Sequence, residues 1–304
     1  MDRQQGLTET LWADAPNAPA RLKQMRARRQ IDALAAEALA TFIEQGFVAL
    51  RGVLPRSTLD DAWRDLDQAQ ALGQSLTCHR EGTGTFQSTQ AQELGVPPGR
   101  YAVHDLHESS AACREVVGHP GFTALLQCLF EGVPVLMQSQ MFRFGSGKGT
   151  HTDFTHCPVA RPLQTATVWI AAEAVDATNG PLYVLPGSHR LPVHRFDNGS
   201  ALWPHGEDRQ QLDRYHQALQ AQCLAAGLRP WSFDAAPGDV LLMHPRLAHG
   251  ALKPMSAART RRSLALHVAA PLAYRGDHRC APGGSALRPA GGLVYYHRHA
   301  QGGV

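Results

Sequence analysis

Residues 179–188, Asn179-Gly180-Pro181-Leu182-Tyr183-Val184-Leu185-Pro186-Gly187-Ser188, are the clearest indication of fold class in this chain. A short apolar run lies between two turn-forming groups, Asn-Gly-Pro before it and Pro-Gly-Ser after it. A short apolar run bounded by such turns is typical of a buried strand in a sandwich or barrel. The segment therefore predicts a β-strand from Leu182 to Leu185.

Further strand-like runs lie on both sides of this one. They are Val133–Phe144, Ala166–Ala172, Val240–His244 and Ser263–Val268. Each run alternates or is continuously apolar between turns, as half-buried and fully buried strands do. We therefore predict a mainly β protein with flanking helices, in which the strands form a double-stranded β-helix, a cupin-like jelly-roll barrel.

Helical patterns precede these strands. Helices and one short strand are predicted, in chain order, at Gln30–Gly46, Phe47–Leu50 (the strand), Pro55–Gly73 and Ser110–Phe130. Gly46 is suited to end the first helix, and Gly118-His119-Pro120 interrupts the last one. Residues 74–110 lack periodicity and are predicted to be loops with one or two short strands.

These patterns divide the chain into a flexible N-terminal arm, residues 1–29, and one domain, residues 30–304. Within the domain we expect a helical part at 30–132 and a barrel core at 133–275. Residues 191–232 interrupt the strand pattern as an insertion with a helical stretch. Long excursions of this kind are often lids or binding loops, and a plain surface helix fits the same pattern.

The composition of the 304 residues excludes some classes of protein. With 43% hydrophobic residues, 18% charged residues and a formal charge of +3, the chain is an ordinary globular protein without the basic surface of a nucleic-acid binder. The six cysteines form no Cys-x-x-Cys pair, and the first twenty residues contain no apolar stretch suited to a signal peptide or membrane span. We expect a cytoplasmic protein with no nucleic-acid or membrane partner.

His151-Thr152-Asp153 and the distant His249 form the main chemical pattern. On an extended strand, side chains two residues apart point to the same face, so His151 and Asp153 would lie side by side. Two imidazoles and one carboxylate leave three positions of an octahedral metal free, as in non-haem Fe(II) enzymes that activate oxygen. Because the chain has sixteen histidines, the alternative for His-x-Asp alone is a hydrogen-bonded surface pair.

Longer motifs surround this pattern. They are the opening run Phe42–Leu54, the segment Asn179–Arg190, the turn Pro237-Gly238-Asp239-Val240 and the run Arg261–His267. Together they resemble the phytanoyl-CoA dioxygenase family of Fe(II)/2-oxoglutarate oxygenases over most of the chain. The resemblance implies that His151, Asp153 and His249 are the iron ligands.

The resemblance also implies residues that bind 2-oxoglutarate. The family holds the far carboxylate with an arginine after the distal histidine, and that position is Arg261, with Arg262 as the alternative. Strand alternation supports Arg261 as the inward-facing residue of the two. Trp169 corresponds to an aromatic residue near the cosubstrate, although a core role explains it equally well. Thr165 or Thr167 on the same strand would offer hydroxyl contacts.

Other polar residues are candidates for the pocket. Gln138 and Gln140 share one face of an otherwise apolar strand, where unpaired amides would be costly unless that face meets solvent. We expect them to contact the cosubstrate, with substrate binding as the alternative. Looser candidates, mainly for substrate binding, are Arg143, His156, Tyr183 and His104. Each of these four is also explained as a structural polar group.

The resemblance implies a reaction in which Fe(II), 2-oxoglutarate and O2 are used, with release of succinate and CO2. The expected outcome is hydroxylation of an unactivated C–H bond in a small-molecule metabolite or natural-product intermediate. Desaturation, epimerisation and cyclisation use the same oxidant and differ in substrate placement, so they remain alternatives. Asp153 argues against halogenation, because related halogenases have a small residue there. No catalytic residue beyond the metal ligands is predicted.

Two interpretations of another class compete with this one. A non-redox jelly-roll metal enzyme, such as a zinc-dependent isomerase or hydrolase, would use the same ligands but has no need for Arg261. A silent binding protein would retain the fold, and the intact ligand set argues against it.

Overall fold

The computed structural model describes residues 9–80, 84–88, 101–157, 159–203, 209–256, 258–274 and 287–297. Its strands are β1 (Phe47–Leu50), β2 (Leu76–Arg80), β3 (Gly84–Ser88), β4 (Tyr101–His104), β5 (Val135–Phe142), β6 (Thr165–Ala171), β7 (Leu182–Val184), β8 (Trp231–Phe233), β9 (Val240–Met243), β10 (His249–Ala251), β11 (Ser263–Ala269), β12 (Leu287–Ala290) and β13 (Leu293–Tyr296). Its α-helices are α1 (Ala18–Ala27), α2 (Ala33–Gln45), α3 (Arg56–Ala71), α5 (Ala111–Val117), α6 (Pro120–Phe130) and α7 (Arg209–Ala225). Short 3-10 helices are η2 (Trp12–Asp14), η3 (Leu106–Glu108), η4 (Asp153–His156), η5 (Pro162–Gln164) and η6 (Ser188–Arg190).

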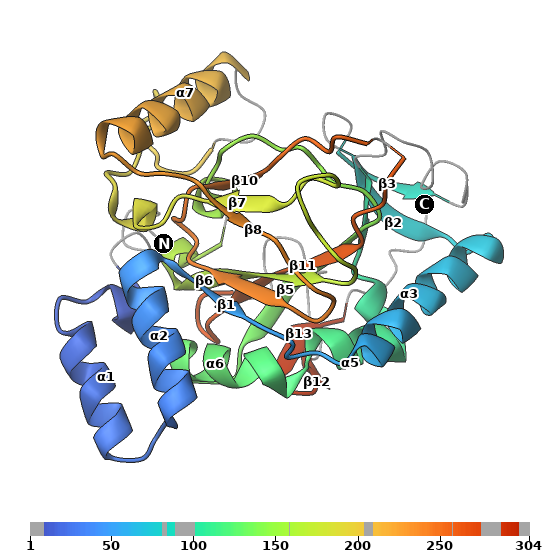
Figure 1. The fold of residues 1–304 in the computed structure, drawn as a ribbon, viewed down its shortest axis with the longest axis horizontal. Coiled ribbons are helices and arrows are strands. Elements are labelled where there is room, and N and C mark those ends of the chain that lie inside the picture. Colours follow the sequence, from blue (N-terminus) through green and yellow to red (C-terminus); the bar gives the residue numbers. More distant parts are fainter. Residues whose placement is uncertain are drawn as a thin grey trace.

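The strands form a large and a small sheet. The large sheet has ten strands in the order β1-β9-β6-β11-β5-β4-β2-β3, and β13 joins it through β5 and carries β12. The small sheet has the order β10-β7-β8 and lies over the large one (Figure 1). Except for β13 on β5, the named strand pairs are antiparallel. The predicted mainly β, jelly-roll class is confirmed, although the large sheet is open and does not close into the predicted barrel.

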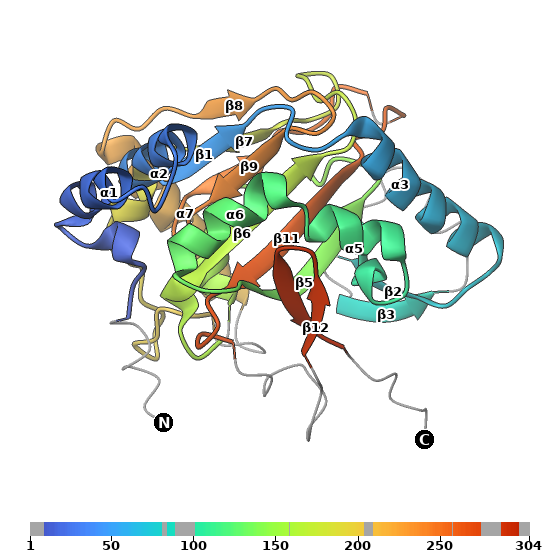
Figure 2. The same cartoon turned by 90° about the horizontal axis from the view of Figure 1, so that it is seen from below.

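Helices cover the outer face of the large sheet. Figure 2 shows α2, α3, α5 and α6 lying across it. On β6, Val168 and Ile170 belong to the core shared with these helices, whereas Trp169 and Ala171 belong to the core between the sheets. Alternate side chains of a strand point to opposite faces, so a strand covered on both faces is apolar throughout. This explains the continuous apolar run in the sequence.

Helix α2 confirms the prediction made from its periodicity. The Asp32 side chain accepts a hydrogen bond from the Ala35 amide at 2.7 Å and caps the helix. Gly46 ends it in the left-handed conformation, with φ of 80°. A Cβ atom at this position would lie 2.4 Å from His189 Nδ1, so the close approach of the buried His189 ring also requires glycine here.

The N-terminal segment differs from the predicted flexible arm. Residues 12–27 contain η2 and α1, and α1 packs against α2 (Figure 1). The Trp12 indole donates a hydrogen bond to the Cys128 carbonyl at 3.1 Å, and Leu22 is buried. Only two residues of α1 are buried, so the helix has almost no amphipathic pattern for sequence reasoning to detect. Residues 1–8 of the predicted arm lie outside the described residues.

The large sheet also extends beyond the predicted barrel core of 133–275. Strand β1 confirms the short strand predicted at Phe47–Leu50. Strands β2 to β4 are three strands in the interval predicted to hold one or two, and at the other end Val294 of β13 pairs with Val135 of β5. Strands β2 to β4 and β13 have four or five residues each, too few for a period to stand out.

Helix α7 lies outside both sheets in the insertion 191–232 (Figure 1). Its buried residues Tyr215, Leu219 and Cys223 are four positions apart, and they pack with Leu185, Phe196 and Ala248. The predicted helical stretch within the insertion is therefore confirmed. In the described part of the chain, no helix combines the length and apolar character needed to span a bilayer.

A buried histidine cluster ties the N-terminal segment to β9. His244 Nε2 lies 3.0 Å from Asp14 Oδ1, and the rings of His189 and His244 are 5.2 Å apart. Burial, then the nearby His244 and Arg190, lower the pKa of His189 from 6.5 to about 4. Asp14 acts in the opposite direction with a smaller effect.

We expect this cluster to make the protein less stable in mild acid. Between pH 6.5 and about 4 the unfolded chain protonates His189 while the folded chain does not, so the free energy of unfolding falls as the pH falls. Urea unfolding of wild type and His189→Gln across this range measures the effect. The variant should lose less stability on acidification, and equal losses in both proteins would contradict the prediction.

Candidate metal centre

The side chains of His151, Asp153 and His249 meet between the two sheets. Asp153 Oδ1 lies 3.6 Å from His151 Nε2 and 3.7 Å from His249 Nε2. One ligand atom from each residue lies within 4.8 Å of the other two. A single cation can therefore contact all three.

Backbone pairing brings the two histidines together. The amide of His151 donates to the carbonyl of His249 at 2.9 Å, and the amide of His249 donates to the carbonyl of His151 at 2.9 Å. This is an isolated bridge and not the extended strand predicted for 151–153, because the chain turns into η4 at Asp153. Thr152 keeps an extended backbone, with φ of −119° and ψ of 140°, so the carboxylate still returns to the side of His151.

Both imidazoles are held in the tautomer that binds a metal. His151 Nδ1 lies 2.8 Å from the Gly149 carbonyl, and His249 Nδ1 lies 3.0 Å from the Leu247 carbonyl. A carbonyl only accepts, so each Nδ1 must carry the proton and donate it. The lone pairs of both Nε2 atoms are then directed toward the metal position beside Asp153, as in histidine-ligated metal sites.

The charge states of the site also suit a cation. Burial lowers the pKa of His151 well below its ordinary value, and Lys148 and His249 lower it further. Burial alone would raise the pKa of Asp153, but its histidine neighbours, led by His249, hold that pKa well below the ordinary value. The site therefore presents a neutral imidazole and a carboxylate at neutral pH, the forms that bind metals.

Thr167 of β6 fixes the second oxygen of the carboxylate. Its hydroxyl donates to Asp153 Oδ2 at 2.5 Å and lies 3.3 Å from His267 Nδ1. Thr167 was one of two predicted hydroxyl contacts to the cosubstrate, and the structure uses it for Asp153 instead. The other, Thr165, donates to the Pro162 carbonyl at 2.8 Å.

Arg261 is a buried cation that retains an unpaired donor. Its residue is 2% exposed, Nη1 donates to the Gly180 carbonyl at 2.9 Å, and Nε has no hydrogen-bond partner. The guanidinium lies 5.6 Å from the Trp169 ring centre. Burial lowers the pKa of Arg261 to about 10, and Glu173 opposes this shift, so the group stays charged at neutral pH. A buried cation with an unpaired donor suits an anionic ligand.

Arg262 lies on the other side of the sheet. Its Nε is also unpaired, but its guanidinium lies 5.3 Å from the ring centre of Trp63 on α3. Arg261, in contrast, reaches the ring of Trp169 in the core between the sheets. The structure thus separates the two arginines as strand alternation predicts, although both precede the first residue of β11.

The two predicted glutamines lie on the inner face of β5. Gln138 is directly opposite His267 of β11, and Gln140 is opposite Ala265. Both amides lie within hydrogen-bonding distance of the His104 ring on β4. Gln138 Nε2 is 2.8 Å from His104 Nδ1, and Gln140 Nε2 is 3.1 Å from His104 Nε2. A neutral imidazole has one donor and one acceptor, so one of the two amides must present its oxygen to the ring. His104 therefore lies on the same inner face of the large sheet as the two glutamines.

Two of the predicted substrate-binding residues point away from the triad. Arg143 forms an ion pair with Asp67 and a hydrogen bond with Gln70, both on α3. Tyr183 lies between two residues of the inner core and so faces outward, where its hydroxyl is 2.7 Å from Thr150 Oγ1. The substrate role predicted for Arg143 and Tyr183 stays a prediction, with both side chains bonded to other residues in this structure. The third, His156, ends η4 three positions after Asp153.

Sequence reasoning missed Tyr215, which lies on α7 and is 2% exposed. Its hydroxyl accepts the Thr152 amide N–H at 2.9 Å and lies 2.8 Å from Thr152 Oγ1. Thr152 separates the two neighbouring ligands. No local pattern could have indicated this contact, because the two residues are 63 positions apart.

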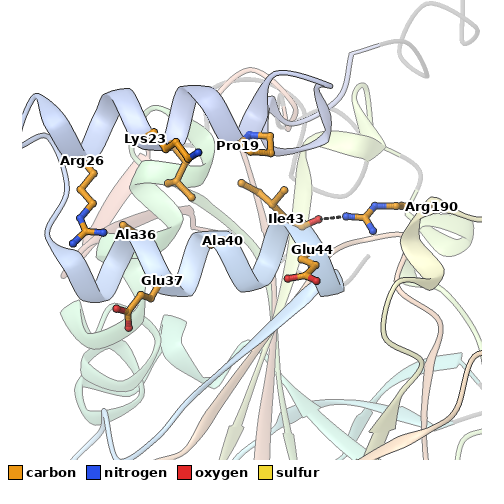
Figure 3. Close-up of a pocket in the computed structure, with 10 residues that line it drawn as sticks. Pro19, Lys23, Arg26, Ala36, Glu37, Ala40, Ile43, Glu44 and Arg190 are labelled. Carbon is orange, nitrogen blue, oxygen red and sulfur yellow. Dashed lines mark hydrogen bonds between the residues drawn. The ribbon is translucent and has the colours of Figure 1, made fainter.

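A groove of about 470 Å³ lies elsewhere, between α1 and α2 (Figure 3). Leu22, Ala40 and Ile43 line it, and Arg190 at one end donates a hydrogen bond to the Ile43 carbonyl at 2.8 Å. None of its lining residues belongs to the triad or to the inner faces of the sheets. We assign it no part in the chemistry of the metal centre.

Solved structures share this fold at low sequence identity. The epimerase SnoN in complex with Fe3+, alpha ketoglutarate and nogalamycin RO superposes with a TM-score of 0.59 and 19% identity, covering 88% of this chain and 99% of SnoN. EctD from S. alaskensis with 2-oxoglutarate and 5-hydroxyectoine superposes with a TM-score of 0.56 and 17% identity, covering 87% of this chain and 88% of EctD. These likenesses show the fold alone.

Curated relatives match parts of the chain. Phytanoyl-CoA dioxygenase domain-containing protein 1 of Rattus norvegicus is 33% identical over 99 residues, which are 30% of this chain and 33% of the relative. Phytanoyl-CoA dioxygenase of Arabidopsis thaliana is 27% identical over 173 residues, which are 54% of this chain and 55% of the relative. The chain thus spans between a third and about half of the length of these relatives.

A family model described as phytanoyl-CoA dioxygenase (PhyH) matches residues 42–263. This range contains all three residues of the triad, the inward-facing Arg261 and the glutamines of β5. Because the match covers well over half of the 304 residues, the protein belongs to the phytanoyl-CoA dioxygenase (PhyH) family.

Proposed function

We propose that this protein is an Fe(II)- and 2-oxoglutarate-dependent oxygenase that hydroxylates an unactivated C–H bond of a small molecule. The arrangement of the triad carries the proposal. Two imidazoles with free Nε2 lone pairs and one carboxylate oxygen surround a single position. This ligand set leaves coordination positions open for a cosubstrate and oxygen.

In this proposal His151, Asp153 and His249 hold the iron. When bound, iron and 2-oxoglutarate together supply an oxidant strong enough to attack a C–H bond. The chain keeps the ligands in place through the carbonyls behind each imidazole and through the Thr167 hydroxyl behind Asp153. Such outer partners orient metal ligands and adjust their basicity.

Arg261 would bind the far carboxylate of 2-oxoglutarate. Its charge lies in a buried environment where a charge-assisted hydrogen bond is strong, and its free Nε donor needs an acceptor. Trp169 would contact the cosubstrate beside it, since the ring already lies next to the guanidinium. We propose no cosubstrate role for Thr165, because its hydroxyl is used by the Pro162 carbonyl.

The side chains on the inner faces of the large sheet indicate the kind of substrate. The described inner faces of β5, β6 and β11 carry amides, imidazoles, hydroxyls and apolar groups, with no lysine or arginine among them. Gln138, Gln140 and His104 can hydrogen-bond to neutral oxygen and nitrogen groups. We therefore propose a small polar metabolite or natural-product intermediate, in preference to an acyl-CoA or a nucleic acid.

Rearrangement without net hydroxylation is the second candidate outcome. SnoN is described as an epimerase and SnoK as a carbocyclase, and SnoK superposes on this chain with a TM-score of 0.57 and 18% identity. The same metal centre would serve either outcome, because substrate placement decides which bond forms after hydrogen abstraction.

We also propose a cytoplasmic location. The five cysteines that the structure describes, Cys78, Cys113, Cys128, Cys157 and Cys223, are free thiols. Burial raises the pKa of Cys113 to about 12, so this thiol is inert. Free thiols of this kind are typical of a reducing compartment.

The proposed function predicts a coloured complex that forms without any substrate. Apoprotein titrated anaerobically with Fe(II) and then with 2-oxoglutarate should develop a weak visible charge-transfer band, because the keto acid chelates the bound iron. Absorption spectroscopy measures it, and Zn(II) in place of Fe(II) is the control that should remain colourless. Bound iron without a band on addition of 2-oxoglutarate would favour a non-redox metal enzyme or a silent binding protein.

A further inference from the structure

We propose that Tyr215 is a positioning residue for the metal centre. Through Tyr215 and further contacts, the insertion 191–232 holds the loop that carries His151 and Asp153 in position. Residues 231–232 of the insertion belong to β8, whereas its described residues 191–203 and 209–230 belong to neither sheet. Sequence reasoning left the insertion open as a lid, a binding loop or a surface helix. The inference rests on the proposed function only in requiring that the triad binds a metal.

The first observation is the partner of Thr152, the residue between the two ligands. Its amide donates to the Tyr215 hydroxyl at 2.9 Å, and its own Oγ1 lies 2.8 Å from the same oxygen. Because the phenol oxygen accepts the amide proton, its own proton is available to the threonine side chain. Thr152 Oγ1 lies in turn 2.9 Å from Thr155 Oγ1. One phenol therefore holds both the backbone and the side chain of Thr152.

The second observation is that the insertion contacts the same loop at further points. The Trp203 amide donates to the Thr155 carbonyl at 2.8 Å. Ala201 packs in one buried cluster with Phe154, which directly follows Asp153. In contrast, the Phe154 amide donates a hydrogen bond of 2.8 Å to the carbonyl of Pro245, which follows β9 of the large sheet. The loop is thus bonded to the jelly roll through Pro245 and to the insertion through Trp203 and Tyr215.

The third observation is that the Tyr215 side chain is buried among aromatic side chains of the insertion. Its ring is 5.8 Å from the ring of Phe196 and 5.4 Å from that of His194, both in the insertion. The same cluster includes Ala248, which immediately precedes His249. Burial raises the pKa of Tyr215, so the phenol keeps its proton at neutral pH. Helix α7 therefore bonds to the segment between His151 and Asp153, and it shares a buried cluster with the residue before His249.

These contacts predict what a lost hydroxyl would do. In Tyr215→Phe the ring still fills its site, but the buried Thr152 amide loses its acceptor. A buried unpaired amide is unfavourable, so the loop would shift to find another partner. A shift there moves Asp153 relative to both histidines. Loss of a partner bonded directly to a metal ligand typically weakens metal binding by roughly 10- to 100-fold, and because Tyr215 acts through the residue between two ligands we expect a loss near the lower end of this range.

The test measures metal affinity and does not depend on turnover. Anaerobic calorimetric titration with Fe(II), and with Mn(II) followed by EPR, compares wild type with Tyr215→Phe. We expect binding that is roughly 10-fold or more weaker and a broadened Mn(II) spectrum. Tyr295→Phe is the matched control, because Tyr295 is a buried tyrosine on β13, in the core under the helices and outside the cluster of Tyr215. It should leave metal affinity unchanged.

Each outcome decides the inference. Wild-type affinity in Tyr215→Phe, or an equal loss of affinity in Tyr295→Phe, would overturn the role of Tyr215. If Tyr215→Phe does not fold, Thr152→Val is used, which keeps the amide bond to the phenol and removes the second contact. It should weaken Fe(II) binding by a smaller factor, and unchanged affinity would overturn the inference. Failure of the proposed function is distinguishable, because it removes the 2-oxoglutarate band of wild type and not the effect of Tyr215→Phe on metal binding.

Discussion

Replacing Asp153 by alanine should abolish turnover of 2-oxoglutarate and severely weaken Fe(II) binding. The substitution removes the only carboxylate of the triad and leaves His151 and His249 without the charge that balances the cation. We expect a loss of more than about 100-fold in succinate release, beyond the range typical of changes outside the ligand set. Fe(II) titration and a succinate assay with 2-oxoglutarate in excess measure the two effects.

Asp60→Ala is the control for this variant. Asp60 is an exposed carboxylate on α3 that forms a surface ion pair with Arg56. Its removal should change neither metal binding nor turnover, because surface ion pairs contribute little. Retained iron-dependent turnover in Asp153→Ala would refute the assignment of Asp153 as a ligand.

Replacing Arg261 by alanine should weaken 2-oxoglutarate binding and leave Fe(II) binding nearly unchanged. The guanidinium is the buried cation beside Trp169, and it does not belong to the triad. A hydrogen bond to a charged group contributes about 1.5–3 kcal/mol, which corresponds to roughly 10- to 100-fold in affinity. The concentration of 2-oxoglutarate needed to develop the charge-transfer band should rise by that factor.

Arg262→Ala is a closely matched control, since it removes the same side chain one residue later. Arg262 lies over Trp63 on the helical side of the large sheet, so its loss should leave the 2-oxoglutarate titration unchanged. An equal effect in both variants would mean that the two arginines act through stability. An effect in Arg262→Ala alone would reverse their assignment.

Local patterns were sufficient for much of the fold. Asp32 at the start of α2 and Gly46 at its end are capping residues whose effect depends on a few neighbouring amides and carbonyls. The apolar run of β6 and the turns around β7 likewise indicate strands without knowledge of their partners. Such features are readable because the physical cause lies within a few residues of the effect.

The candidate site likewise contains residues that the sequence predicted and contacts that depend on residues far apart in the chain. His151, Asp153, His249 and Arg261 were predicted by residue, and the structure brings the first three together around one position. Thr167 was one of two threonines predicted to offer hydroxyl contacts to the cosubstrate, and in the structure its hydroxyl donates to Asp153, a bond that the sequence pattern did not indicate. No local pattern indicated that the Arg143 side chain pairs with Asp67 on α3, because these two residues are far apart in the sequence.

The sequence by itself determined the class of fold, the ligand types of the metal centre and the face on which Arg261 lies. These depend on strand and helix periods, on turn chemistry and on which side chains can bind a cation. Only the tertiary structure decided that α1 packs against α2, that β13 pairs with β5, and that Tyr215 holds the residue between two ligands. Contacts between residues far apart in the chain depend on the register of whole elements against one another, which no short stretch of sequence encodes.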